Sequence, residues 1–161
     1  MMATEIERKF LVKDSTYKKL ATGILYRQGY LSVNPNATVR IRVVGDKAFL
    51  TVKGSNHGAS RLEFEYELPI QEANEMLDRL CIKPIIEKYR YKIEYERNIW
   101  EVDEFIGDNA GLVIAEVELK HEHDVLVKPD FIGDEVTNDE RYYNSNLVKN
   151  PYKKWKLHTD L

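Results

Sequence analysis

The chain has 161 residues, of which 32% are charged, and a formal net charge of −3. Its length suits one domain, which we place over residues 1–161, and its weak acidity excludes the strong positive field that drives nonspecific binding to nucleic acid. The single cysteine, Cys81, excludes an internal disulfide and a multi-cysteine zinc site. Because the start of the chain is rich in charge and no apolar run has the length of a membrane span, we predict a cytoplasmic protein with no membrane partner and no nucleic-acid partner.

Eight segments are predicted to form strands because apolar and charged side chains alternate along them. Turn-forming residues, such as those at 34–36 and 45–46, separate several of these segments, so most are expected to pair as antiparallel hairpins. The predicted strands are residues 6–12, 25–33, 38–44, 47–53, 60–68, 85–96, 99–105 and 113–119.

Helices are expected to be few. The clearest covers residues 71–80, where apolar residues recur at three- and four-residue spacing. Shorter helices are predicted at residues 14–20 and 139–147, and residues 121–131 are expected to form an exposed linker. The predicted fold is therefore α+β in class but dominated by β-structure.

The charged residues of the predicted strands gather on one face of each strand, because side chains two apart in an extended segment share a face. Glu5, Glu7 and Lys9 do so in the first strand, and Arg40 and Arg42 do so in the third. For any one strand, an ordinary antiparallel sheet with one solvated face explains this alternation. The signs, however, are grouped into pairs of Glu or pairs of basic residues, and blocks of one sign are costly to bury unless opposite charge neutralises them.

A sheet whose charged faces must meet is most easily closed into a barrel, which also leaves no unpaired edge. We therefore predict a closed eight-stranded antiparallel barrel with a few flanking helices. Carboxylates that share its interior would need bound divalent cations, and the basic side chains would need a polyanion. An oligophosphate chelated by metal answers both needs.

The order of these motifs resembles that of the CYTH superfamily, also called the triphosphate tunnel metalloenzymes. The E-x-E-x-K signature at Glu5, Glu7 and Lys9 begins the match, and residues 135–147 resemble the closing segment of the small bacterial members. Between them lie V-R-I-R at residues 39–42, T-V-K at 51–53, R-x-E-F-E at 61–65, E-K-Y-R at 87–90 and A-E-V-E-L at 115–119. The resemblance covers nearly the whole chain and implies a tunnel with charged residues inside and apolar residues outside, under helices.

The resemblance also implies a role for the charged residues of the interior. Divalent metal, Mg²⁺ or Mn²⁺, would bind at Glu5, Glu7 and one or both of Glu116 and Glu118. The triphosphate path would be lined by Lys9, Arg40, Arg42, Lys53, Lys88 and Arg90. The additional inner carboxylates, which could hold a second ion, orient basic residues or position water, are Glu63, Glu65 and Asp103. An ion pair with a lysine or arginine is an equally good interpretation for Glu63, Glu101 and Asp103.

Two tyrosines, Tyr26 and Tyr30, share a face of the second predicted strand. A phenol near a lysine can transfer a proton to a leaving group, so we take Tyr30 together with Glu5, Glu7 and Lys9 as candidate catalytic residues. The alternative is that both tyrosines belong to the core, with their hydroxyls in water.

Two further segments carry weaker signals. His121 and His123 lie close together but lack the other ligands of a transition-metal site, so we predict no such site there. Residues 153–156 are basic and include a tryptophan, and we expect them to be solvated rather than to contact nucleic acid. Arg141 and Lys149 precede them, in a segment that could plug one mouth of the barrel.

Together these features predict hydrolysis of inorganic triphosphate to pyrophosphate and phosphate inside a charged barrel. Thiamine triphosphatase and class IV adenylate cyclase stay open as alternatives, because both need the same inner charges. A noncatalytic polyphosphate-binding module is a further alternative, which the paired glutamates disfavour. The expected partner is inorganic triphosphate or another small molecule that carries a triphosphate, and the chain could act as a homodimer.

Overall fold

The computed structural model describes residues 4–159 of the chain. Strands dominate this part, and the helices are short. In chain order the elements are β1 (Thr4–Val12), α1 (Tyr17–Leu20), β2 (Ile24–Asn34), β3 (Ala37–Val44), β4 (Lys47–Lys53), β5 (Ser60–Leu68), α2 (Ile70–Arg79), β6 (Ile86–Tyr95), β7 (Asn98–Ile106), η1 (Gly107–Asn109), β8 (Val113–Glu118), β9 (Ile132–Glu135), η2 (Glu140–Tyr142), α3 (Asn144–Lys149) and α4 (Tyr152–Thr159).

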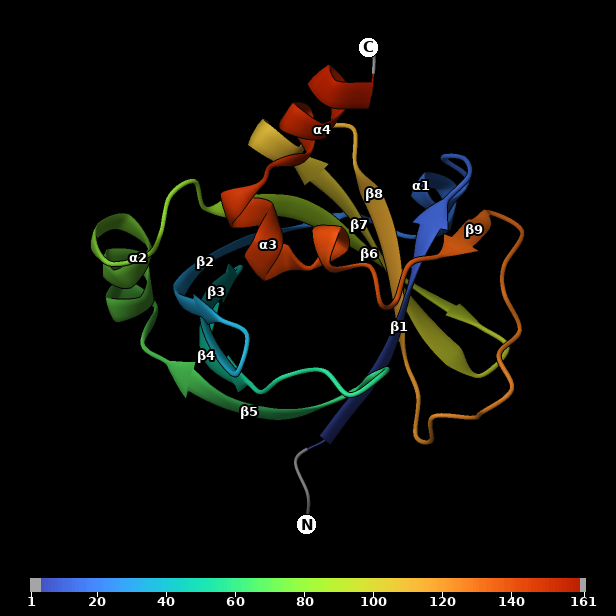
Figure 1. Cartoon of the computed structure of the whole chain (residues 1–161), viewed down its shortest axis with the longest axis horizontal. Helices are drawn as coiled ribbons and strands as arrows, with labels where there is room; N and C mark the ends of the chain where they lie inside the picture. Colours follow the sequence, from blue (N-terminus) through green and yellow to red (C-terminus); the bar gives the residue numbers. More distant parts are fainter. Residues whose placement is uncertain (1–3, 160–161) are drawn as a thin grey trace.

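Eight of the strands form a closed antiparallel ring (Figure 1). The order around the ring is β5-β4-β3-β2-β6-β7-β8-β1, and a short pairing of β1 with β5 closes it. All eight strands predicted from the alternation of charge are present, so the predicted eight-stranded closed sheet is confirmed. A ninth strand, β9, pairs with the second half of β1 and lies outside the ring.

Two of the three apolar clusters lie on the outer side of the ring. Phe10 and Trp100, with ring centroids 5.4 Å apart, belong to a buried cluster on the outer faces of β1, β7 and β8. Helix α2 lies beside the ring next to β4 (Figure 1), and its Ala73 and Leu77 pack in a second cluster with side chains of β3 and β4. The third cluster lies on the inner face at one end of the ring, where Leu147 of α3 packs with Phe105 and Ile114. Because period-two alternation turns apolar side chains outward to the first two clusters, it turns the charged side chains of the same strands inward.

The predicted helix at residues 71–80 is confirmed as α2, and the short helix predicted at 14–20 is present as α1, whereas the predictions for the third helix and the linker need correction. The helix expected at 139–147 is broken: η2 ends at Tyr142, and α3 begins at Asn144. The linker at 121–131 is not exposed throughout, because Phe131 is buried in the core. It leads into β9, whose four residues are too few to show alternation.

The basic tail forms a helix, α4. Trp155 packs its ring against Tyr142 and Tyr152, with centroid distances of 5.1 Å and 5.3 Å. This contact anchors the start of α4 beside η2. No helix in the described part of the chain is long and apolar enough to span a membrane.

Candidate active site

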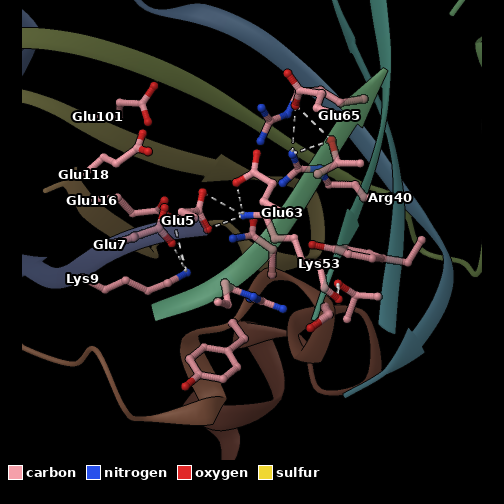
Figure 2. Close-up of a pocket in the computed structure, with 18 of the residues that line it drawn as sticks. Glu5, Glu7, Lys9, Arg40, Lys53, Glu63, Glu65, Glu101, Glu116 and Glu118 are labelled. Atoms are coloured by element: carbon pink, nitrogen blue, oxygen red, sulfur yellow. Dashed lines mark hydrogen bonds and ion pairs between the residues drawn. The ribbon is translucent and has the colours of Figure 1, made fainter. Parts of the chain in front are cut away.

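The interior of the ring holds a cavity of about 210 Å³ (Figure 2). Every strand of the ring contributes at least one side chain to its wall. The predicted site residues that line it are Glu5, Glu7, Lys9, Tyr30, Arg40, Arg42, Lys53, Glu63, Glu65, Lys88, Arg90, Glu116 and Glu118. Asp103 is the predicted site residue that lies behind this wall rather than in it.

Carboxylates crowd one side of the cavity. In the strand register, Glu7 stands opposite Glu118, and Glu101 stands opposite Glu116. Like charges in directly opposed positions destabilise a sheet unless something neutralises them. Burial raises the pKa of Glu7 to about 8, and the charges of Glu116 and Glu5 add to this rise. This side of the cavity therefore lacks positive charge.

Two lysines supply part of the positive charge that these carboxylates require. The Nζ of Lys53 donates to both carboxylate oxygens of Glu5, at 2.9 Å and 3.2 Å, and lies 3.8 Å from Glu63 (Figure 2). The Nζ of Lys9 donates to Glu116 at 3.4 Å. Although burial lowers the pKa of Lys9, Glu116 and Glu7 raise it above the ordinary lysine value.

The chemistry of this donor set suits a hard divalent cation. Carboxylate oxygens are the ligands that Mg²⁺ and Mn²⁺ prefer in proteins. As the side chains stand, no three His, Cys, Asp or Glu residues in the described part of the chain converge to hold a metal ion. Because the lysines occupy oxygens of Glu5 and Glu116, metal binding would require these carboxylates to turn away from the lysines.

Basic side chains crowd the other side of the cavity. Burial and, to a smaller extent, the charges of Arg40 and Arg90 lower the pKa of Arg42 to about 10. Burial also lowers the pKa of Lys88 to about 7, despite the attraction of a nearby carboxylate. The Nε of Arg40 is buried and has no hydrogen-bond partner among the described residues. A polyanion would supply negative charge to this basic side and a hydrogen-bond acceptor to the Nε of Arg40.

Asp103 holds two of these basic groups in place. Its carboxylate accepts hydrogen bonds from Arg90 at 2.7 Å and 2.9 Å, and the Nζ of Lys88 lies 2.8 Å away. Although burial raises the pKa of Asp103, Arg90 and Lys88 lower it below the usual range. Of the two interpretations of Asp103 in the sequence, the structure adopts the ion pair.

Glu63 and Glu65 line the cavity from β5. The hydroxyl of Thr51 donates to Glu65 at 3.0 Å and accepts from Arg40 at 3.3 Å. Thr51 therefore links a carboxylate to an arginine of the basic side. Strand alternation would have placed Thr51 on the same face as Lys53, but a neutral side chain gave no charge signal.

The two tyrosines of β2 differ in role. Tyr30 is buried and lines the cavity. The ring of Tyr26 lies below the guanidinium groups of Arg90 and Arg42, at 4.7 Å and 5.2 Å from its centroid. These are cation–π distances, so Tyr26 supports the basic side of the cavity from behind.

The C-terminal segment also reaches the cavity. The sequence did not show which of its residues would do so. Tyr143, Asn144 and Ser145 line it at the start of α3. Arg141, in contrast, pairs with the neighbouring Asp139 at the surface, with an N–O distance of 2.6 Å. The sequence suggested that this segment closes one mouth of the barrel. It has no periodic pattern that would indicate which of its side chains enter the cavity.

Comparison with known proteins shows the family of the chain. A family model described as "CYTH domain" matches residues 3–150. A relative named "Inorganic triphosphatase" from Acetivibrio thermocellus is 61% identical over 96% of this chain and 99% of its own, and one of the same name from Nitrosomonas europaea is 36% identical over 90% and 97%.

Solved structures agree as well. The crystal structure of an inorganic triphosphatase superposes with a TM-score of 0.63 at 33% identity, covering 91% of this chain and 95% of that chain. A putative adenylate cyclase from Bacillus halodurans shares the fold, with a TM-score of 0.57 at 23% identity over 75% of this chain and 84% of that chain. The predicted family is confirmed, and the chain belongs to the CYTH domain family.

Proposed function

We propose that this protein hydrolyses inorganic triphosphate to pyrophosphate and phosphate with the help of Mg²⁺ or Mn²⁺. The observation that carries the proposal is the division of one closed cavity into a carboxylate side and a basic side. Relatives at 61% and 36% identity that are named inorganic triphosphatases support it. A bare triphosphate chelated by metal complements both sides at once.

The basic side would bind the phosphoryl oxygens. Arg40 offers its unpartnered Nε, and Arg42, Lys88 and Arg90 supply further donors. Binding of the anion would raise the pKa of Lys88, because the charge lowers the cost of keeping a buried ammonium protonated. The fixed Asp103 ion pairs hold Lys88 and Arg90 in place before substrate arrives, so little reorganisation is needed.

The carboxylate side would hold the metal through Glu5, Glu7, Glu116 and Glu118. When bound, a divalent cation neutralises phosphoryl charge and lowers the pKa of a coordinated water. In the reaction, a water oxygen forms a bond to one terminal phosphorus while the anhydride P–O bond breaks, and pyrophosphate leaves with the bonding electron pair. Because Lys9 has a raised pKa, we assign it to charge neutralisation, and we assign Tyr30 to hydrogen bonding in the cavity wall.

The shape of the site favours an inorganic substrate over the alternatives. The aromatic residues that line the cavity are Tyr30 and Tyr143, and Tyr30 packs in one cluster with Leu147 of α3. Glu101 and Glu118 line the other end. That end therefore has no ring among its described lining residues on which adenine or a thiamine ring could stack. A noncatalytic anion binder would gain nothing from the opposed carboxylates.

Phosphate release tests this proposal directly. The protein is incubated with triphosphate in the presence of Mg²⁺, Mn²⁺ or a chelator, and both products are quantified. We expect phosphate and pyrophosphate in equal amounts with metal and none with chelator. Absence of turnover with either metal, or turnover that persists in chelator, would contradict the proposal.

Replacing Arg42 by alanine should weaken substrate binding with little effect on stability. A charge-assisted hydrogen bond to phosphate contributes about 1.5–3 kcal/mol, so kcat/KM should fall roughly 10- to 150-fold. The fold should lose little, because the lost contacts to Tyr26 and Gln28 are offset by relief of repulsion from Arg40 and Arg90.

The matched control is Arg27→Ala on neighbouring β2, where the side chain pairs with Glu87 at the surface and does not line the cavity. Steady-state kinetics and thermal denaturation are measured for both variants. An Arg42→Ala protein that melts early but turns over triphosphate normally would assign Arg42 to the sheet rather than to the substrate.

A further inference from the structure

The two ends of the cavity differ in access to solvent. Near the C-terminal segment, Gln28 and Lys88 are 0% and 1% exposed. At the other end, Glu118 is exposed, and the Glu101 side chain keeps 30% of its surface accessible. Figure 2 shows Glu101 and Glu118 at the opposite end of a row from Lys9, whose Nζ lies 5.6 Å from the ring centroid of Tyr143.

The accessible end continues into a surface groove. Glu101 and Glu118 line both the cavity and this groove, which has a volume of about 740 Å³ and is also bordered by Lys92, Lys120 and Val125. Val125 is 91% exposed, so the groove opens to solvent. This end is therefore open to solvent, and the leading phosphoryl group of a phosphate chain that entered here would travel toward the C-terminal segment.

One side chain stands at the buried end of that path. The Oδ1 of Asn144 accepts hydrogen bonds from the Nζ of Lys88 at 3.1 Å and from the Nε2 of Gln28 at 3.2 Å. Gln28 in turn accepts from the Nε of Arg42 at 3.3 Å. Asn144 is thus bound to the side chains that would receive the leading phosphoryl group.

The chain around Asn144 is fastened to β1. The backbone N–H of Lys9 donates to the hydroxyl of Thr137, and the backbone N–H of Val136 donates to the carbonyl of Lys9. Glu135 accepts two hydrogen bonds from Arg8, at 2.7 Å and 2.9 Å. The segment that leads to Asn144 is therefore fastened to β1, the strand that carries Glu5, Glu7 and Lys9.

We propose that Asn144 stops the phosphate chain at the buried end of the cavity. The position of this stop determines which anhydride bond lies beside the carboxylates of the metal side. This inference rests on the proposed triphosphatase function. The stop fixes how far the leading phosphoryl group can advance past Glu5 and Glu7. Asn144 is then a specificity-determining residue, because it selects which anhydride bond is cut.

Triphosphate hides this choice, because cutting either bond gives the same products. Linear tetraphosphate reveals it. Attack of water on a terminal phosphorus breaks an outer P–O bond and gives phosphate and triphosphate, whereas cutting the central bond gives two pyrophosphates. A single register yields one of these product pairs.

The experiment quantifies the first products formed from tetraphosphate, under single-turnover conditions with Mg²⁺, by wild type and Asn144→Ala. We expect one product pair to dominate for wild type and the ratio to change by roughly tenfold or more in Asn144→Ala, as removal of a hydrogen-bonded side chain implies. Asn144→Gln keeps the amide and should keep a single dominant pair. Circular dichroism and melting temperature establish that each variant is folded.

Asn146→Ala is the matched control. Asn146 lies on the same short helix but donates to the carbonyl of Glu140 instead of lining the cavity. Three results would overturn the role of Asn144 as a stop. They are mixed products from wild type, an unchanged product ratio in an active Asn144→Ala protein, and an equal change of the ratio in Asn146→Ala. If wild type fails to cleave triphosphate itself, the proposed function fails, and that result is distinct from any of these.

Discussion

Glu7→Gln is expected to lower the metal-dependent kcat/KM for triphosphate by about 100-fold or more, since even outer partners of a metal site contribute 10- to 100-fold. The substitution keeps the size of the side chain and removes the charge that a cation requires. Glu7 lies at the centre of the carboxylate side, opposite Glu118 and close to Glu116 and Glu5. The measurement is the initial rate across a magnesium titration.

The same substitution should stabilise the metal-free protein. Folding raises the pKa of Glu7 from 4.5 to about 8, so ionisation of Glu7 opposes folding at any pH above its unfolded value. The melting temperature of Glu7→Gln in chelator should therefore exceed that of wild type at pH 8, and the difference should vanish as the pH falls toward 4.5.

Glu94→Gln is the control, because Glu94 is an exposed strand carboxylate that does not line the cavity. It should match wild type in both activity and stability. Wild-type rates from Glu7→Gln at every magnesium concentration would remove Glu7 from the metal site.

Asp103→Asn is expected to destabilise the fold by about 3–5 kcal/mol, the usual cost of removing one partner of a buried ion pair. The substitution leaves Lys88 and Arg90 without their shared counterion. Addition of triphosphate in chelator should recover part of the loss, because an anion that binds only the folded state stabilises it. Urea denaturation followed by the fluorescence of buried Trp100 measures both effects.

Asp108→Asn serves for comparison, since Asp108 pairs with Lys153 at the surface, where an ion pair contributes about 1 kcal/mol or less. If Asp103→Asn is as stable as wild type, Asp103 does not hold the basic side in place. A loss of metal affinity without a loss of stability would instead favour the metal-ligand interpretation of Asp103.

Alternation of charge along the strands predicted the ring and most of its lining. Glu5, Glu7 and Lys9 share a face because of strand geometry alone, and the apolar neighbours Ile6 and Phe10 fix which face turns outward. Such a pattern is local, so a single sequence reveals it. It could not show that Asp103 would be covered by Lys88 and Arg90, because that depends on the register between β6 and β7.

The C-terminal contribution depends on the path of the chain rather than on a local pattern. Asn144 reaches the cavity only because β9 pairs with β1 and Thr137 then binds the backbone of Lys9. A four-residue strand and one hydroxyl leave no periodic signal. The sequence therefore indicated that a closing segment exists, but not which of its side chains meets the substrate path.

Whether the cavity is built for a bare triphosphate is tested most directly by a side-by-side measurement of kcat/KM for triphosphate and ATP with Mg²⁺. Basic groups line one side of a cavity of about 210 Å³ and carboxylates line the other, whereas a nucleoside would have to remain in the outer groove, where the described residues offer no ring for stacking. We predict a preference for triphosphate on the order of 100-fold, equivalent to the loss of one or two charge-assisted phosphate contacts by ATP. Equal or greater efficiency on ATP, or formation of cyclic AMP with pyrophosphate, would contradict the account.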